Sequence, residues 1–195
     1  NALSPGTLSL ERHRLLWVFL ENETDFFNKS NKILHIAPEQ CFHKNFKKNF
    51  ISYITCDLNS PLAEIKADVC DLPFEENQFD YVLCNHVLEH VYDDNKAMRE
   101  IYRVLKYEGK AILQVPINNK LEKTIDGRNT LDVNLRNKLF GQYDHLRAYG
   151  LDYYDKLTQV GFKVEKIDQT KKMDESLIGK YSLVRGEIIP YCTKI

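Results

Sequence analysis

Five residues in the middle of the chain carry the clearest chemical signal, His86-Val87-Leu88-Glu89-His90. H-x-x-E-H is a zinc-hydrolase pattern, in which two histidines one helical turn apart bind the metal and the glutamate serves as base. The same residues, placed just after a buried strand, can instead form the rim of a cofactor crevice. The first interpretation predicts a metal-dependent hydrolase, and the second predicts an enzyme that binds a nucleoside-like cofactor.

The motif lies inside a strand–helix–strand unit. Residues 79–84 are apolar enough for a buried strand, residues 93–105 have the apolar spacing of a helix, and residues 110–115 again resemble a buried strand, with Gly109 between. Such a βαβ unit builds a parallel sheet and opens a crevice at the carboxyl ends of its strands. We therefore expect the motif to lie at the edge of a crevice.

The helix that the zinc pattern requires is weakly indicated. The helical signal becomes strong only near Asp93, and no third ligand is evident downstream. The crevice interpretation is therefore favoured, with Asn85 and His86 facing the crevice and His90 packed. It requires no bound metal.

The rest of the chain alternates strands and helices, which predicts an α/β doubly wound sheet. Residues 118–146 show little periodicity, which is typical of a functional insertion or lid. Further helices are expected at 8–21, 39–49 and 152–160, and further strands at 32–37, 50–56, 65–69, 162–167 and 181–191, the last two as an antiparallel pair.

Acidic residues lie where two of these strands end. Asp57 ends the second expected strand, where a carboxylate can accept both ribose hydroxyls of an adenosine; alternatively it is a turn aspartate before Asn59. Asp68 and Asp71 flank the end of the third, where a carboxylate can accept from an adenine amino group while Leu72 packs on the ring. The loop 37–41 lacks the glycines of G-x-G-x-x-G, which disfavours a nicotinamide or flavin cofactor.

Six segments together resemble the class I S-adenosylmethionine-dependent methyltransferases, closest to the type 11 methyltransferase-domain group. They are ILHIAPEQC (33–41), ITCDL (54–58), ADVCDLPFEENQFDYVLCNHVLEHV (67–91), MREIYRVL (98–105), YEGKAILQVP (107–116) and LTQVGF (157–162). The resemblance implies a Rossmann-like doubly wound sheet of seven strands, mostly parallel with an antiparallel last strand, and S-adenosyl-L-methionine as cofactor. The expected organisation is a single methyltransferase domain over residues 1–195, with an N-terminal helical extension (1–30) and a lid or insertion after the fifth strand (118–150).

The resemblance also implies roles for single residues. Asp57 corresponds to the ribose-binding acid, Asp71 and Leu72 to the pair beside the adenine, and Asn85 to the residue that lines the methionyl end. The family usually has an acidic residue where His35 stands and glycines at three nearby positions, so we expect Glu39 to supply the carboxylate for the cofactor's ammonium group; a plain acidic residue in the first turn of a helix is the alternative. The expected cofactor-binding residues are His35, Ala37, Glu39, Asp57, Leu58, Asp71, Leu72, Asn85 and His86.

Methyl transfer needs alignment of the nucleophile and removal of its proton, for which a histidine suits an oxygen or amine acceptor. His145, in the segment 140–150, is the first candidate base, with His86 and Tyr143 as further catalytic candidates. Arg147 could clamp an anionic substrate and Tyr149 could contact it. The structural alternative is that an Asp144–Arg147 pair fixes the lid while His145 packs.

Composition sets the remaining limits. The 195 residues are 43% hydrophobic and 28% charged, with 27 basic and 28 acidic residues and a net charge of −1, so no global field favours nucleic acid. The longest apolar run is too short for a membrane span, and five scattered cysteines without a CxxC pair indicate a cytoplasmic protein. We expect a monomer or dimer that acts on a small molecule or a glycan or lipid precursor. A zinc hydrolase using His86, Glu89 and His90, and a non-catalytic methyltransferase-like module, are the alternatives.

Overall fold

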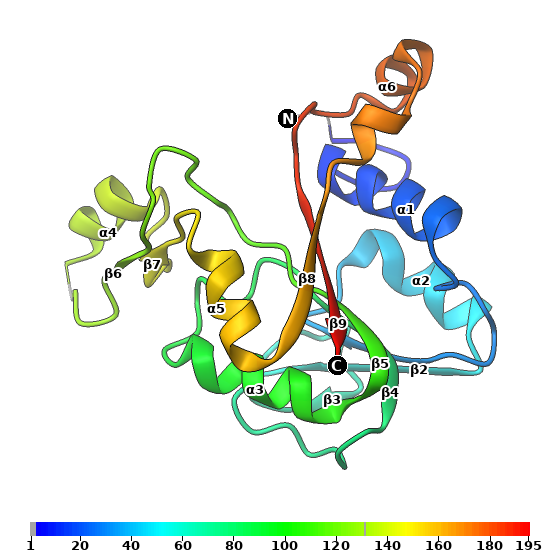
Figure 1. Cartoon of the computed structure of the whole chain (residues 1–195), viewed down its shortest axis with the longest axis horizontal. Helices are drawn as coiled ribbons and strands as arrows, with labels where there is room; N and C mark the ends of the chain where they lie inside the picture. Colours follow the sequence, from blue (N-terminus) through cyan, green and yellow to red (C-terminus); the bar gives the residue numbers. More distant parts are fainter. Residues whose placement is uncertain (1–2, 131) are drawn as a thin grey trace.

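The main sheet of this computed structural model, which describes residues 3–130 and 132–195, has seven strands in the order β3-β2-β1-β4-β5-β9-β8 (Figure 1). β9 runs antiparallel to both of its neighbours, and the other neighbouring strands run parallel. The expected seven-stranded sheet with an antiparallel last strand is confirmed. The strands are β1 (Lys32–Ile36), β2 (Ser52–Asp57), β3 (Ile65–Lys66), β4 (Phe79–Cys84), β5 (Leu105–Ile112), β8 (Phe162–Ile167) and β9 (Ile189–Lys194).

Helices cover both faces of this sheet, because the central strands carry apolar side chains on both faces. One core holds Val82 and Cys84 of β4 with α3 (Asp94–Val104) and α5 (Tyr153–Val160). The other core holds Tyr81 and Leu83 with three helices. These are α1 (Glu11–Glu23), α2 (Gln40–Asn49) and α6 (Glu175–Tyr181), and a short 3-10 helix, η1 (Gln169–Lys172), precedes α6.

The register of the central strands places their carboxyl ends at one level. Ile36 pairs with Cys56 of β2 on one side and with Cys84 of β4 on the other. The strand order reverses between β1 and β4, which is where open α/β sheets bind ligands. The residues that follow these strands therefore meet at one crevice.

Residues 118–130 and 132–150 form a lobe beside the sheet, drawn in yellow-green in Figure 1. The lobe contains β6 (Ile125–Asp126), α4 (Val133–Phe140) and β7 (Arg147–Ala148), and β6 pairs antiparallel with β7. The low periodicity of residues 118–146 had indicated none of these elements. Phe140 is the buried residue of α4, so this helix has almost no apolar periodicity in the sequence.

The largest differences from the expected boundaries concern the last strand and β5. The last strand begins at Ile189, and the stretch expected to start it at Tyr181 instead ends helix α6 and continues as a loop. β5 begins at Leu105, immediately after α3, so Gly109 lies inside the strand. The register between β4 and β5 shifts at this point, which is the signature of a local bulge.

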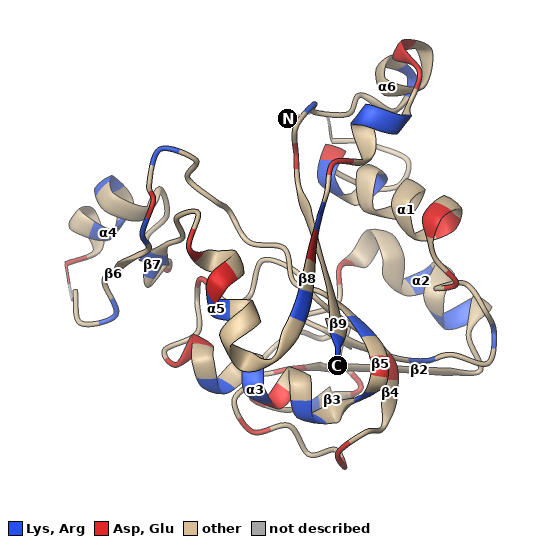
Figure 2. Cartoon of the chain, viewed as in Figure 1, with Lys and Arg blue, Asp and Glu red and all other residues tan. Residues whose placement is uncertain are grey.

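Charges are mixed over the surface, as Figure 2 shows for α3, which carries both signs. Of the helices in the described ranges, none combines the length and the apolar character that a bilayer crossing requires.

Candidate functional site

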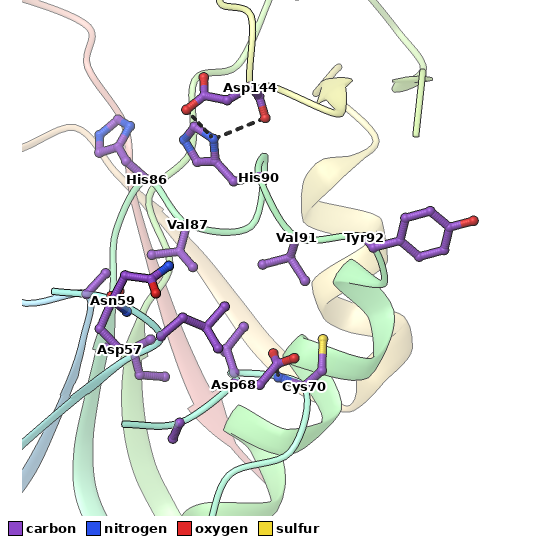
Figure 3. A pocket seen from close by; sticks show the side chains of 15 residues that line it. Asp57, Asn59, Asp68, Cys70, His86, Val87, His90, Val91, Tyr92 and Asp144 are labelled. Carbon is purple, nitrogen blue, oxygen red and sulfur yellow. Dashed lines mark hydrogen bonds and ion pairs between the residues drawn. The ribbon is translucent and has the colours of Figure 1, made fainter. Parts of the chain in front are cut away.

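A pocket of about 620 Å³ opens at the carboxyl ends of β1, β2 and β4 (Figure 3). This volume lies within the usual range for small-molecule sites. Its walls come from the loops after these strands, from the turn after β4 and from the lobe. The lining residues are Ile36, Ala37, Asp57, Leu58, Asn59, Ala67, Asp68, Val69, Cys70, His86, Val87, His90, Val91, Tyr92 and Asp144.

Asp57 lies at the end of β2 and borders the pocket together with Leu58. Its Oδ1 accepts hydrogen bonds from the backbone N–H groups of Asn59 at 2.7 Å and Ser60 at 2.6 Å. The carboxylate thus stabilises a turn, which is the alternative role that the sequence suggested for Asp57. It also faces the pocket, where Figure 3 shows it beside Asn59.

After β3, the pocket is lined by Asp68 and Val69 and not by the expected pair Asp71 and Leu72. Leu72 is buried in the core, and its N–H donates to Glu100 Oε2 at 2.9 Å. The expected roles of Asp71 and Leu72 at the adenine therefore do not fit their positions. Asp68, which the sequence had placed beside the same strand end, lies at the pocket in their place.

The loop after β1 contains a buried polar network. His35 is fully buried; its Nδ1 lies 2.8 Å from the Tyr53 hydroxyl and its Nε2 contacts Glu39 Oε2. Asn85, at the end of β4, donates from Nδ2 to Glu39 Oε1 at 3.1 Å. Burial opposes ionisation of Glu39, but the His35 ring and the Asn85 amide outweigh it and hold the pKa of this carboxyl below its usual value.

This network changes the expected role of His35. A fully buried ring behind Glu39 does not contact a ligand in the pocket, so His35 positions Glu39. Glu39 and Asn85 do not line the pocket themselves; Asn85 precedes the lining residue His86, and Glu39 lies two positions after the lining residue Ala37. Ala37 itself has a φ of +51°, the left-handed backbone for which the family's usual residue is glycine.

His86 borders two cavities. It lines the main pocket and a second one of about 200 Å³ that also contains Gln114 and Glu187. Its backbone φ is +54°, and its N–H donates to the Gln114 carbonyl at 2.7 Å. The side chain is 29% exposed, and its Nδ1 lies 3.5 Å from Glu89 Oε1. Of the expected base candidates, His86 is the one that faces the main pocket.

The stretch 86–90 is a turn, and helix α3 begins only at Asp94. The zinc-hydrolase pattern needs one helix under both histidines, because only then do their rings lie on one face. The two histidines of the motif do not have that arrangement here. The zinc-hydrolase alternative based on His86 and His90 is therefore set aside.

The lobe brings His145 to the other side of this turn. His145 Nδ1 lies 3.1 Å from the Phe140 carbonyl, and its ring meets the His90 ring edge-on at 4.8 Å between centroids. His145 lines a separate cavity of about 270 Å³, together with Glu89, and not the main pocket. Tyr143 is 59% exposed. Neither residue borders the expected cofactor site.

Arg147 and Tyr149 occupy the interior. The Arg147 guanidinium donates to the carbonyls of Leu88, Val91 and Tyr92 and lies 3.6 Å from Asp94 Oδ2. The Tyr149 hydroxyl donates to Asp94 Oδ2 at 2.9 Å. The expected substrate-binding roles of these two residues do not fit, because both are buried and their polar groups already have partners.

The lid contact also differs from the expected one. Asp144 pairs with His90, whose Nδ1 lies 3.4 Å from Asp144 Oδ2 (Figure 3). Arg147 pairs with Asp94. Asp94 was not predicted from the sequence as the buried partner of Arg147. An aspartate at the start of a helix normally indicates a capping or dipole role, so no local signal identified it.

Residues 28–113 match the family model described as Methyltransferase domain, Methyltransf_11. A protein of Methanocaldococcus jannaschii described as uncharacterized is 48% identical over 123 residues, which are 60% of this chain and 52% of that protein. The ubiquinone/menaquinone biosynthesis C-methyltransferase of Rickettsia prowazekii is 35% identical over 85 residues, which are 44% of this chain and 33% of that enzyme. The chain thus spans about half or less of the length of these relatives.

Among solved structures, the YcgJ protein of Bacillus subtilis has the same fold. Its TM-score is 0.59 at 16% identity, and the match covers 93% of this chain and 94% of that one. At this identity the likeness shows a shared architecture.

Proposed function

Because residues 28–113 match the methyltransferase-domain family model, we propose that the chain is a class I S-adenosylmethionine-dependent methyltransferase, which transfers the methyl group of S-adenosylmethionine to an oxygen or nitrogen acceptor. We further propose that the acceptor is a small molecule or a glycan or lipid precursor, handled by a single domain whose lobe, residues 118–150, covers the acceptor side. The observation that carries the proposal is the pocket that lies where the strand order reverses. Two carboxylates line this pocket, Asp57 and Asp68.

The residues around the pocket divide into three groups that match an extended nucleoside. Asp57 and Leu58 are assigned to the ribose, where the carboxylate accepts the two hydroxyls. Asp68 and Val69 are assigned to the adenine, in place of the pair predicted from the sequence. Glu39, held by His35 and Asn85, is assigned to the ammonium group of the methionyl part, because an ionised carboxylate with a lowered pKa stays charged at neutral pH.

His86 is assigned the role of the base that removes the proton of the acceptor. Bound S-adenosylmethionine supplies a methyl group on a positively charged sulfur, an already activated leaving group. The protein must therefore hold the acceptor in line and remove its proton. His86 borders both the main pocket and the neighbouring cavity, so a nucleophile between them lies within its reach. His145 and Tyr143 lie on the far side of the turn and are assigned to the acceptor side of the lobe.

Calorimetric titration with S-adenosylmethionine and with its demethylated product tests the proposal. Wild-type protein is expected to bind both ligands. Asp57→Asn keeps the shape of the side chain but loses the charge, and Glu39→Ala removes the proposed ammonium partner. Each is expected to weaken binding about 10- to 100-fold, the usual value of a charged hydrogen bond.

The matched control is Asp126→Asn, since Asp126 lies in the lobe and pairs with Arg128 at the surface; it is expected to bind both ligands like wild type. Absence of binding to wild-type protein would remove the transferase proposal and favour a non-catalytic module. Unchanged affinity in Glu39→Ala would remove the assignment of the ammonium group alone.

A further inference from the structure

Glu89, His90 and His145 converge behind the turn that follows β4. Each offers one metal-ligating atom, and these three atoms lie within 4.8 Å of one another. Two ligands come from the turn and one from the lobe, so the cluster exists only because the lobe folds back onto the turn. We propose that these three residues bind a divalent transition-metal ion, which holds the acceptor oxygen for the methyl transfer proposed above.

The hydrogen bonds of the two histidines engage Nδ1 of each ring, so Nε2 is the nitrogen that can bind a metal ion. His90 Nδ1 lies 3.3 Å from the Asp144 carbonyl and 3.4 Å from Asp144 Oδ2. His145 Nδ1 lies 3.1 Å from the Phe140 carbonyl. These oxygens accept only, so the tautomer that carries its proton on Nδ1 satisfies them and leaves the lone pair of Nε2 for a metal ion. Metal-binding histidines are oriented in this way by a carboxylate or a backbone carbonyl on the other nitrogen.

Glu89 gives an independent indication of a cation. Its side chain is 2% exposed, and Oε2 has no hydrogen-bond partner among residues 3–130 and 132–195. A buried carboxylate oxygen without a partner is costly unless a cation or a donor completes it. Arg147, a buried cation that lines the same cavity as Glu89, is occupied by three carbonyls and by Asp94. A metal ion beside Glu89 would supply the missing partner.

The ligand set determines the class of metal. Two imidazoles and one carboxylate suit zinc, iron(II), cobalt(II) and related ions, whereas magnesium and calcium prefer oxygen ligands alone. Bonds of about 2.1 Å hold neighbouring ligand atoms about 3 to 3.5 Å apart, so the cluster must close by about 1 Å on binding. The site spans a contact between lobe and turn, where side-chain rotation can provide that closure. Three protein ligands leave further positions open for an acceptor.

The position of the cluster gives the ion its role, which rests on the proposed function. His90 lines the main pocket, and Glu89 and His145 line the neighbouring cavity of about 270 Å³. An acceptor hydroxyl bound to the ion would lose its proton to His86, and its oxygen would form a bond to the methyl carbon. The carbon–sulfur bond breaks, and its electron pair stays on the sulfur, which becomes a neutral thioether.

Cobalt(II) is the probe for the site, because its visible absorption reports the number and type of its ligands. The chelator-treated 195-residue chain is titrated with cobalt(II), and binding is measured by absorption and calorimetry. One ion per chain is expected. Glu89→Gln and His145→Ala are each expected to weaken binding at least about 100-fold, and Asp144→Asn, which only orients His90, about 10-fold.

His43→Ala is the matched control, because it removes a histidine from α2 that lies outside the cluster. It is expected to bind cobalt like wild type. Circular dichroism on each variant confirms folding. No cobalt binding by wild type, or equal binding by the Glu89→Gln, His145→Ala and wild-type proteins, would overturn the metal site.

Two further titrations separate this inference from the proposed function. Acetohydroxamate added to the cobalt protein is expected to shift the absorption bands, since its oxygens enter the open positions; no shift would overturn the role in acceptor binding. S-adenosylmethionine is titrated in the same samples. Cofactor binding without cobalt binding defeats the metal site alone, and cobalt binding without cofactor binding defeats the transferase proposal and with it the acceptor role of the ion.

Discussion

Two pocket residues have a backbone that L-amino acids rarely adopt. Ala37 follows β1 with a φ of +51°, and His86 follows β4 near its end with a φ of +54°. The left-handed conformation costs a residue with a β-carbon about 1 to 2 kcal/mol. Both positions lie where the backbone turns away from neighbouring strands at the pocket. Such strain concentrates at functional sites, where the surrounding structure imposes it.

The strain at Ala37 is testable by a single substitution. Ala37→Gly is expected to raise the free energy of unfolding by about 0.5 to 1 kcal/mol, because glycine adopts a positive φ without steric cost, less the entropy it loses on folding. Urea denaturation followed by circular dichroism measures the change. Ala63→Gly, at a loop position without positive φ, is expected to lower stability by about 0.5 to 1 kcal/mol. The same loss in both variants would show that Ala37 is unstrained.

At the scale of single elements, one side chain fastens the lobe to the sheet. Arg147 of β7 is 1% exposed and donates to three carbonyls of the segment that follows β4. Asp94, also buried, faces Arg147 from the first residue of α3, and the Tyr149 hydroxyl donates to it. This network positions the lobe against the turn, and therefore His145 against His90.

Replacement of Arg147 is expected to lower the free energy of unfolding strongly. Arg147→Met keeps much of the side-chain volume but leaves Asp94 with a longer ion pair, to Lys156 at 3.8 Å. The expected loss is about 3 to 5 kcal/mol of stability, the usual cost of breaking a buried ion pair, as measured by denaturant unfolding. Arg128→Met is the matched control in the same lobe, because the Arg128–Asp126 pair is partly exposed and is expected to contribute less than about 1 kcal/mol. Equal losses would refute the role of Arg147.

The elements that the sequence predicted well are those with strong apolar patterns. β4 and β8 have the expected bounds, and α3 differs by one residue at each end. α4 and α6 were missed because each buries one residue, Phe140 or Ile178, and so shows no periodicity. Local pattern predicts elements that face the core, and it is uninformative for elements that lie at the surface.

The same limit applies to the pocket. Ala37, Asp57, Leu58 and His86 were predicted, because strand ends can be located from the sequence. Arg147 was assigned to substrate because a guanidinium group suits bidentate recognition of an anion, but its side chain is buried. Its burial depends on Asp94, more than fifty positions away in the chain, and no local pattern contains that information.

At the scale of the whole molecule, the sheet separates two cores, and α1 closes the second of them beside the pocket loop. His13 of α1 connects the two regions: its Nδ1 accepts from the Leu10 N–H at 3.1 Å and lies 3.3 Å from Cys41 Sγ. Its ring meets Phe42 of α2 edge-on at 5.5 Å between centroids. The N-terminus of α1 is therefore stabilised by the neutral form of His13, whose Nδ1 must be unprotonated to accept the hydrogen bond from Leu10.

This contact predicts a dependence of global stability on pH. Burial lowers the pKa of His13 from 6.5 to about 4; Glu39 opposes the shift, and Arg12 adds to it. Below pH 6.5 the unfolded chain binds a proton that the folded chain does not, so stability falls as the pH drops towards 4. The size of the pKa shift limits the loss of stability to about 3 kcal/mol, and the partial exposure of His13 reduces this loss to about 2 kcal/mol. Urea unfolding of wild type and His13→Gln between pH 7 and about pH 4.5 measures it. The variant should lose less stability than wild type over this range, because glutamine can accept from Leu10 without titrating; parallel profiles would show that His13 is protonated at no cost in the folded chain.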